Sequence, residues 1–434
     1  MIMKPNAKLL ALVLVTLGIL LLVGCAQSQP APTAAPETKP TAAPAQPTAA
    51  PTAVPKATSA PATPAAAAKP TIPAASSTGI PLIPASHQPL EQRSECLACH
   101  KQGGFMPAPA SHAGRTGETC KSCHQAKPAE KPPVLNLTAA KADKAPTLDG
   151  VAEDAWSKAK PVTIHVNGGI NKGETDVTMK ALYSQDTIYF LAQYKDPTES
   201  LRRQPWVKQQ DGSWKALSGA EAYEDKFAVI WNINDSIKGF NEQGCAVICH
   251  ATTQGRDRPL KYTNAEGEIG DTWHVKMVRT NPVGQIDDQY VDNDTKAAEA
   301  GRKSDAKTAG GYTNNKKEGQ NTPPFALPGN KPAPPYWIMD SEKVPFDDSK
   351  YKAGDEVPGI VIAPFTGDRG DLSAKAVWKD GAWTIEWSRK LQTGSKTDVQ
   401  FDPKKEFYFG VAVFDDAQIG HAVQYGVTKL TFEQ

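Results

Sequence analysis

The chain has 434 residues, which at about 150 residues per domain allows roughly two or three domains. Its 48 Lys and Arg residues balance its 47 Asp and Glu residues, so the formal net charge is +1. No basic excess is present to bind a phosphate backbone, and nucleic acid is excluded as a partner. The seven cysteines are an odd number, so at least one of them has a role outside a pair.

The N-terminal segment has the features of an export signal. Lys4 and Lys8 precede an apolar run, Leu9–Val23, which is shorter than the roughly 20 residues of a membrane-spanning helix. Small residues then lead into Cys25, as in bacterial lipoprotein signals. We expect residues 1–25 to form a lipoprotein signal peptide ending at a lipidated Cys25, whose acyl chains hold the exported protein on a periplasmic or extracellular membrane face. An ordinary signal peptide with a chance cysteine, or an uncleaved anchor, is the alternative.

The next segment, residues 26–80, is dominated by Pro, Ala and Thr. Such a composition cannot bury enough apolar surface to offset the entropy lost on ordering. Dense proline favours extended polyproline II segments. We therefore expect a disordered linker that lifts the folded part off the membrane, and an O-glycosylated stalk would have the same geometry.

The six remaining cysteines form three pairs, and two pairs have the sequence C-x-x-C-H. This is the attachment signature of c-type haem, in which two thiols bind the porphyrin and the histidine binds iron. Zinc or a redox dithiol does not account for two pairs that are each followed by histidine. The predicted covalent attachments and proximal iron ligands are Cys96, Cys99 and His100 in the first motif, and Cys120, Cys123 and His124 in the second.

A second repeat accompanies these motifs. The sequence P-A-S-H occurs at Pro84–His87 and again at Pro109–His112, each time ahead of a haem motif. We expect His87 and His112 to be the distal iron ligands of two bis-His haems, although the spacing leaves open which histidine serves which iron. An exposed turn is the alternative. Residues 81–130 are thus predicted to be a dihaem cytochrome c segment in which the haems supply most of the core.

The third pair has one extra residue between the cysteines. Cys245, Cys249 and His250 form a C-x-x-x-C-H sequence, which is a weaker signal than C-x-x-C-H. A disulfide beside a chance histidine is the alternative. Because the chain already carries two haem-attachment motifs and the Cys-His adjacency is kept, we predict a third covalent haem c with His250 as its proximal ligand.

Beyond residue 135 the sequence is rich in short β-type runs separated by turn signals. Asp380-Gly381 lies between two such runs and predicts a hairpin. Short strands without long helical periodicity predict a mainly β fold, an immunoglobulin-like β-sandwich covering residues 135–434. The expected strands include Val177–Tyr183, Ile188–Tyr194, Phe227–Ile233, Trp383–Trp387, Phe407–Phe414 and Val427–Phe432.

This portion resembles the haem-binding domain of the ethylbenzene dehydrogenase family. The matching motifs, in chain order, are Leu148–Trp156, Gly244–His250, Asp271–Lys276, Arg279–Gly284, Asp287–Tyr290, and Phe414–Asp416 with His421. The resemblance implies a haem-binding β-sandwich, found in cytochrome subunits of molybdenum enzymes and in c-type cytochromes. The family's best-known haem subunit holds b-type haem through Met and Lys, whereas this sequence has the Cys pair and His250, so that ligation does not carry over directly.

Four residues are candidates for the distal ligand of the third iron. In the run around Trp273, strand alternation puts His274 and Lys276 on one face and Met277 on the other. A porphyrin on the apolar face would take Met277, and one on the polar face would take His274 or Lys276. His421 is the fourth option. His165 is expected to be a surface or core histidine without a role in ligation.

The polar region from about Thr252 to Lys352 is expected to form long loops around the third haem. It contains a run of acidic residues that does not fit the helix–loop–helix calcium spacing. A solvated acidic loop is the prediction for Asp287, Asp288, Asp292 and Asp294.

No hydrolytic or phosphate-binding motif is present, and no catalytic residue is predicted. The leading hypothesis is an exported, lipid-anchored trihaem c-type cytochrome that passes electrons between respiratory partners. The candidate partners are a molybdenum oxidoreductase and another cytochrome. We expect an electron carrier rather than a stand-alone enzyme, because six-coordinate haems leave no position for a substrate. The alternatives are small-ligand binding, sensing or catalysis at the sandwich haem, and a carbohydrate-binding sandwich that carries haems as passengers.

Overall fold

The computed structural model describes residues 96–100, 108, 110–113, 132–171, 173–250, 260–296 and 300–434. The predicted signal peptide with Cys25, the linker, His87 and the second haem motif at Cys120–His124 lie outside the described residues. Among the described helices, none has the length and apolar character needed to cross a membrane.

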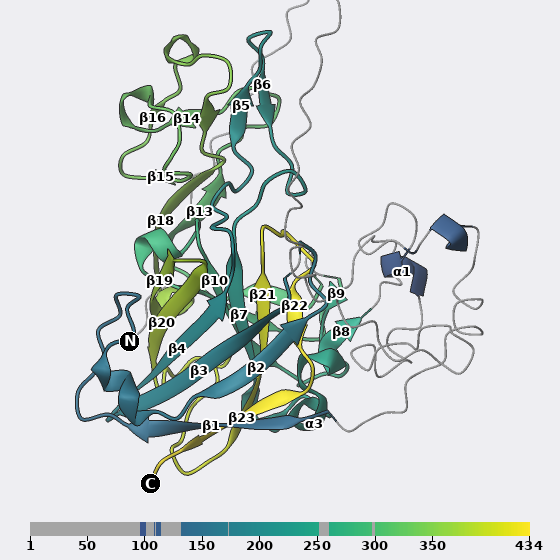
Figure 1. Ribbon diagram of the computed structural model, residues 1–434, viewed down its shortest axis with the longest axis vertical. Coiled ribbons are helices and arrows are strands. Elements are labelled where there is room, and N and C mark those ends of the chain that lie inside the picture. Colours follow the sequence, from purple (N-terminus) through teal and green to yellow (C-terminus); the bar gives the residue numbers. More distant parts are fainter. Residues whose placement is uncertain are drawn as a thin grey trace, which may run out of the picture. The chain divides into compact units, whose positions relative to one another are not determined.

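Thirteen strands form one large sheet, in the order β12-β11-β10-β7-β21-β22-β2-β3-β4-β20-β19, with β1 and β23 paired alongside (Figure 1). These strands are β1 (Val134–Lys141), β2 (Val162–Asn167), β3 (Thr175–Ser184), β4 (Thr187–Lys195), β7 (Lys226–Asn232), β10 (Gly270–Lys276), β11 (Asp287–Val291), β12 (Arg302–Ser304), β19 (Ser373–Lys379), β20 (Ala382–Lys390), β21 (Phe407–Phe414), β22 (Ala422–Gln424) and β23 (Val427–Phe432).

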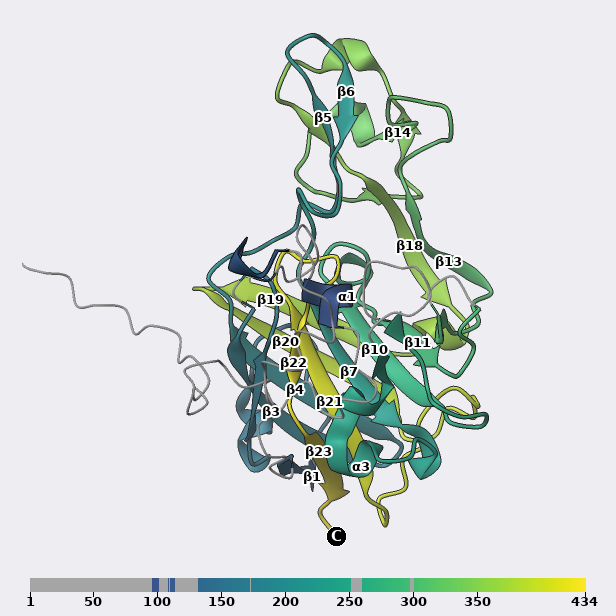
Figure 2. The same cartoon turned by 90° about the vertical axis from the view of Figure 1, so that its right-hand side faces the viewer.

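The two halves of this sheet pack face to face, as the two views in Figures 1 and 2 show. Phe190 of β4 meets Trp231 of β7 and Trp273 of β10, with ring centroids 5.8 Å apart in each pair. Phe190 also stacks on Trp387 of β20 at 5.3 Å. Burying an aromatic side chain of this size contributes about 2–3 kcal/mol to folding. The prediction of a mainly β sandwich is confirmed.

The predicted hairpins form because strand alternation and turn residues agree. In β19–β20, Asp380 and Gly381 both have positive φ, 52° and 78°, as a two-residue hairpin turn requires. The late strands β21 and β23 have the bounds expected from the sequence.

Several strands lie between residues 252 and 352, a region that was expected to form long loops. That prediction is wrong for β11, β12 and the short strands of residues 260–345. The run around Trp273, which was expected to be a strand, forms β10 and belongs to the large sheet with β11 and β12. A separate apolar cluster contains Trp206, Trp214 and Tyr351. The remaining strands are β5 (Trp206–Lys208), β6 (Trp214–Ala216), β8 (Cys249–His250), β9 (Leu260–Lys261), β13 (Ala309–Asn314), β14 (Phe325–Ala326), β15 (Ile338–Met339), β16 (Val344–Pro345), β17 (Glu356–Val357) and β18 (Ile360–Thr366).

The described helices are all short. The α-helices are α1 (Cys96–His100) and α3 (Phe240–Gln243). The 3-10 turns are η3 (Ala110–His112), η4 (Asp154–Lys158), η5 (Ile233–Asp235), η6 (Gly244–Ile248), η7 (Asn281–Val283), η8 (Pro328–Asn330), η9 (Asp348–Lys350) and η10 (Asp368–Gly370).

One buried carboxylate explains the motif that opens the domain. Glu386 of β20 accepts hydrogen bonds from the indole Nε1 of Trp156 at 2.7 Å and from the backbone N–H groups of Gly150 at 2.7 Å and Asp149 at 3.1 Å. Gly150 has φ +81°, and a Cβ there would collide with Val377. The motif therefore has this spacing because it places three hydrogen-bond donors around the carboxylate of Glu386.

We predict that Glu386→Ala lowers the free energy of unfolding by about 3 kcal/mol, because three buried donors lose their acceptor. Chemical denaturation of the full-length protein measures this change. Glu174→Ala, which removes a carboxylate 66% exposed, serves as the matched control with a change within about 0.5 kcal/mol. Equal stability of the two variants would contradict the anchoring role of Glu386.

Candidate functional site

The third cysteine pair lies on a tight turn against the outer face of the sheet, the face turned away from the other half of the sandwich. Cys245 in η6 is 3% exposed and packs in a cluster with Ile230 of β7. Gly410 of β21 lies next to it, and a Cβ at Gly410 would be in ordinary van der Waals contact with the sulfur of Cys245, at 3.7 Å. Gly244 has φ +64°, and a Cβ there would collide with the carbonyl oxygen of Gly426. The missing side chain of Gly244 thus allows the turn to lie close to the backbone at Gly426.

His250 follows directly in β8, which pairs with β9. Its ring stacks on Tyr262 with centroids 3.8 Å apart and an interplanar angle of 11°. Its Nε2 lies 3.0 Å from the carbonyl oxygen of Tyr262. The predicted proximal ligand is therefore buried beside the cysteine turn and oriented by an aromatic ring.

Three rows of side chains cross the outer face of β10, β7 and β21. Directly opposed residues of antiparallel strands point to the same face, so the register defines each row. The first row passes beneath Cys245, the second consists of a histidine and two alanines, and the third brings two lysines and a phenylalanine together. The rows are Thr272–Ile230–Gly410, His274–Ala228–Ala412 and Lys276–Lys226–Phe414.

His274 thus shares a face with Cys245, one row away along the strands. It is 9% exposed, and its Nε2 has no hydrogen-bond partner among the described residues. Burial lowers its pKa well below the usual value, and nearby cations, with Lys276 the strongest, add to this effect. A neutral imidazole with an unsatisfied buried nitrogen is the state in which histidine binds a metal.

Met277 lies on the opposite side of the sheet. It is 1% exposed and packs in the core between the two halves together with Trp273 and Val275. Lys276 shares the face of His274, but its ammonium is paired with Asp287 and donates to the hydroxyl of Tyr312 at 2.9 Å. Of the residues in this run, the geometry therefore leaves His274 with an uncommitted ligand atom beside the cysteine turn.

His421 also lies near Phe414, the last residue of β21. The ring of Phe414 is 4.6 Å from that of His421 and 5.3 Å from that of His274. Burial lowers the pKa of His421 to about 3, with smaller contributions from Lys261 and Lys226. Both imidazoles are thus neutral at physiological pH and flank one aromatic ring.

Lys226 is a functional candidate that the sequence reasoning missed. It is 2% exposed, and its ammonium donates to the carbonyl oxygen of Gln418 at 3.1 Å and lies 3.9 Å from the ring centroid of Phe414. No carboxylate pairs with it within the part of the chain that the structure describes. A lysine at the start of an otherwise apolar strand was the signal available in the sequence.

The N-terminal haem motifs are described only in part. Cys96 and His100 lie at the two ends of α1 and are partly exposed, and His112 lies at the end of η3.

His165 of the sandwich, which was not expected to bind iron, is exposed. Its Nδ1 lies 2.8 Å from a carboxylate oxygen of Asp176, as expected for a surface histidine.

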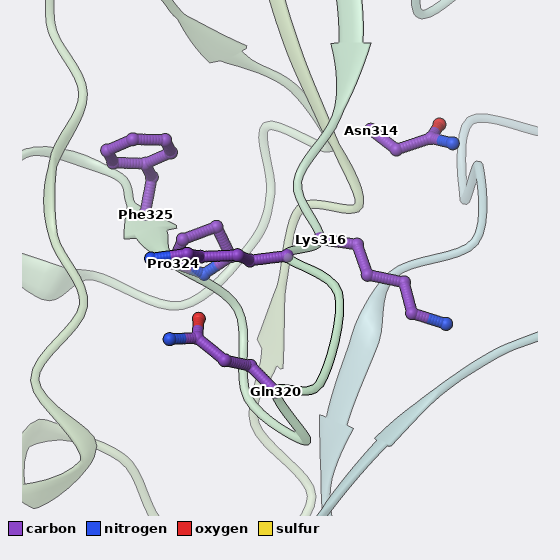
Figure 3. A pocket seen from close by; sticks show the side chains of 6 residues that line it. Asn314, Lys316, Gln320, Pro324 and Phe325 are labelled. Atoms are coloured by element: carbon purple, nitrogen blue, oxygen red, sulfur yellow. The ribbon is translucent and has the colours of Figure 1, made fainter.

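A separate pocket lies in the segment around β14 (Figure 3). None of the predicted haem residues contributes to it. It is lined by Asn314, Lys316, Lys317, Gln320, Pro324 and Phe325.

Asp225, next to Lys226, is a buried carboxyl group at the edge of the site. Its oxygens accept from the backbone N–H groups of Ser200 at 2.8 Å and Asp416 at 2.9 Å. Burial, followed by the charge of Asp196, raises the pKa of Asp225 to about 8. The folded state therefore holds a proton that the unfolded state has already released.

This difference predicts a pH effect whose sign follows from proton binding. Between about pH 4 and pH 8 the folded state binds more protons at Asp225, so this group lowers the free energy of unfolding as the pH rises. Relative to wild type, Asp225→Asn should gain roughly 1–3 kcal/mol between pH 5 and pH 8. Urea unfolding of both proteins at the two pH values measures the gain. Because the comparison uses the change in unfolding free energy between the two pH values, any loss of stability that does not depend on pH cancels.

Asp211→Asn, at a fully exposed carboxyl group, is the matched control for the pH experiment. It should show no change relative to wild type over the same range. A flat difference for Asp225→Asn would mean that Asp225 is ionised in the folded protein.

Comparison with known proteins gives one family match. Over residues 153–426, more than half of the chain, the sequence matches the family described as ethylbenzene dehydrogenase. No curated protein matches the chain. Among solved structures, a family 9 carbohydrate-binding module from Caldicellulosiruptor kristjanssonii in complex with cellotriose is 10% identical, with a TM-score of 0.29 over 69% of this chain and 95% of that chain. The module in complex with glucose is also 10% identical, with a TM-score of 0.28 over 70% and 97% of the two chains.

The family match contains the cysteine turn, the three rows of side chains and His421, all within one continuous span. It agrees with the resemblance inferred from the separate sequence motifs. The chain belongs to the ethylbenzene dehydrogenase family.

Proposed function

We propose that this protein is an exported, lipid-anchored trihaem c-type cytochrome that carries electrons between respiratory partners. Two haems would be attached at the C-x-x-C-H motifs in residues 81–130, and the third at Cys245 and Cys249 on the sandwich. The observation that carries the proposal is the cysteine turn with its adjacent His250, buried over the same sheet face as the uncommitted imidazole of His274.

The composition of that face supports a planar group. Between the cysteine turn and the lysine row, the side chains of β7 and β21 are no larger than methyl groups at Ala228 and Ala412, and Gly410 has none. Small side chains on a pleated surface allow close approach by a flat ring. Cys245 and Cys249 would hold the porphyrin, His250 would bind the iron as proximal ligand, and His274 is the favoured distal ligand.

The buried lysine supports the same reading. Lys226 has no carboxylate partner among the described residues and is nearly inaccessible to solvent. A buried ammonium without a counter-ion is costly, and its pKa falls well below the usual value because of burial. Haem brings two propionates, and one of them would supply the missing negative charge.

A haem ligated on both sides supplies one-electron redox chemistry and has no open position for a substrate. The protein residues would fix its orientation through His250, Tyr262 and His274, and would exclude water through the apolar cluster around Cys245. Family membership favours a redox role, and a molybdenum oxidoreductase is one candidate partner. The proline-rich linker and Cys25 would give the carrier reach from a membrane surface.

The first prediction from this proposal concerns the number of covalent haems. Intact mass and the pyridine haemochrome spectrum of the mature protein should give three haems per chain. The double variant Cys245→Ser/Cys249→Ser should give two, because the thioether attachment is lost. Two haems in the wild type would contradict covalent attachment on the sandwich.

The second prediction separates the two favoured distal ligands. His274→Ala should convert about one third of the haem from the low-spin to the high-spin ferric spectrum, because one of three irons loses a ligand. Met277→Leu, which preserves volume in the core, is the matched control and should leave the spectrum unchanged.

Spectral change in Met277→Leu but not in His274→Ala would reverse the assignment. A wild-type protein that is already partly high-spin, with a spectrum that shifts when carbon monoxide is added, would instead support small-ligand binding or catalysis at the sandwich haem. An unchanged spectrum in both variants would leave His421 or a lysine as the ligand and would contradict the proposed role of His274.

A further inference from the structure

A second group of unusual side chains lies away from the cysteine turn, on the inward side of the same strands. Asp271 of β10, Asp288 of β11 and Asp398 in the loop after β20 are each no more than 1% exposed. One oxygen of each carboxylate lies within 4.8 Å of those of the other two. Three segments of the chain, far apart in sequence, thus bring carboxylates to one buried point.

Each of the three carboxylates is held through one oxygen. Oδ2 of Asp271 accepts from Nη1 of Arg389 and from the backbone N–H of Val399, both at 2.9 Å. Oδ1 of Asp288 accepts from the backbone N–H of Gln289 at 3.0 Å, and Oδ2 of Asp398 accepts from the hydroxyl of Thr393 at 2.6 Å.

Among the described residues, no donor group hydrogen-bonds the other oxygen of each carboxylate. Oδ1 of Asp271, Oδ2 of Asp288 and Oδ1 of Asp398 make no hydrogen bond among the described residues. Asp305, 5% exposed and close enough to raise the pKa of Asp288, has neither oxygen satisfied. Buried carboxylate oxygens are almost always paired in folded proteins, so this concentration indicates a group that the protein itself does not supply.

The charges of the surrounding side chains indicate that the missing group is a cation. The three carboxylates and the guanidinium of Arg389 have a formal charge of −2, and the neighbouring carboxyl groups of Asp305 and Asp371 add to it if they are ionised. An isolated buried charge of this size is not stable, so the carboxylates must either bind protons or share a cation. A divalent cation would offset the charge of −2 on the three carboxylates and Arg389.

We propose that Asp271, Asp288 and Asp398 form a structural Ca²⁺ site, with Asp305 beside it. Calcium prefers an all-oxygen set and accepts irregular geometry and bidentate carboxylates, whereas Mg²⁺ demands near-ideal octahedral coordination and keeps its waters. Zinc and copper are disfavoured because no described histidine or cysteine belongs to the cluster. The site is independent of the proposed haems.

The bound cation would stabilise the edge of the sandwich. It would add a link between the loop around Asp398 and the paired strands β10 and β11. That loop already contacts β10 through Arg389 and through the hydrogen bond from Val399 to Asp271. Strand β10 also carries His274, three residues after Asp271 on the opposite face. Calcium would therefore fix the strand that presents the favoured iron ligand without touching the haem pocket.

Another acidic group shows this pattern at Asp196 alone, whose Oδ2 has no hydrogen-bond partner among the described residues. Asp196, Asp225 and Asp415 also have carboxylate oxygens within 4.8 Å of one another. In that group both oxygens of Asp225 already accept hydrogen bonds, and Asp415 is only partly buried. Protons suffice to satisfy it, and we assign no cation there.

The test uses the full-length, haem-loaded protein. After treatment with EDTA, it is dialysed against calcium chloride or magnesium chloride, and bound metal is measured by inductively coupled plasma mass spectrometry. We expect one Ca²⁺ per chain and a rise in Tm on the order of 5 °C with saturating calcium. Asp288→Asn should weaken calcium binding on the order of tenfold or more, because the unpartnered oxygen becomes an amide.

Two controls distinguish a variant that fails to fold from one that folds but fails to bind calcium. In EDTA, Asp288→Asn should be at least as stable as wild type, since one buried like charge is removed. Asp292→Asn, from the same acidic run but paired with Lys303 at 2.6 Å, should bind calcium like wild type.

Three results would overturn the proposal. No retained calcium together with a Tm indifferent to EDTA would mean that the carboxyl groups bind protons instead. Calcium binding lost in Asp415→Asn but kept in Asp288→Asn would move the site to the other acidic group. Preference for magnesium over calcium would reject the ion assignment.

Discussion

The central strands of this sandwich are buried on both faces, and the rest of the structure depends on that constraint. Every residue of β7 and of β10 is buried. Their inward side chains, including Trp231 and Trp273, form the aromatic core between the two halves of the sheet. Their outward side chains are therefore available for a second buried environment, and a polar residue on either face needs a partner from another segment.

The buried polar residues on the two faces of β10 have partners of opposite charge. The outer face carries His274 and Lys276, opposite Ala228 and Lys226. Cations dominate there, and the lowered pKa values of His274 and His421 keep both imidazoles neutral. The inner face carries Asp271 near Asp288, where carboxylates dominate and burial raises the pKa of Asp271 to about 7. A strand with period-two alternation thus separates a site suited to an anionic planar group from one suited to a small cation.

Much of the fold could be predicted from the sequence. Strands such as Phe407–Phe414 are marked by apolar β-branched and aromatic residues, and the Asp380-Gly381 turn follows from local backbone preferences. The acidic run shows where this reasoning fails. Asp287 and Asp288 were expected in a solvated loop, but they are fully buried in β11, because Lys276, Arg369 and neighbouring carboxyl groups surround them from other segments. A charge pattern carries no information about partners that are distant in sequence.

The sequence by itself determined the chemistry available to this protein: three Cys-His groups, the strands that carry the core, and the family to which residues 153–426 belong. Local spacing is enough for these features, because thioether attachment, strand alternation and turns involve residues that are close along the chain. Only the tertiary structure decided that His274 and Met277 lie on opposite sides of one sheet, and which of these sides Cys245 covers. It also decided that Lys226 is buried with no carboxylate paired to it among the described residues. Those facts arise from the pairing of β10 with β7 and of β7 with β21, and strand pairing over such separations is set by the packing of the whole sandwich rather than by any local signal.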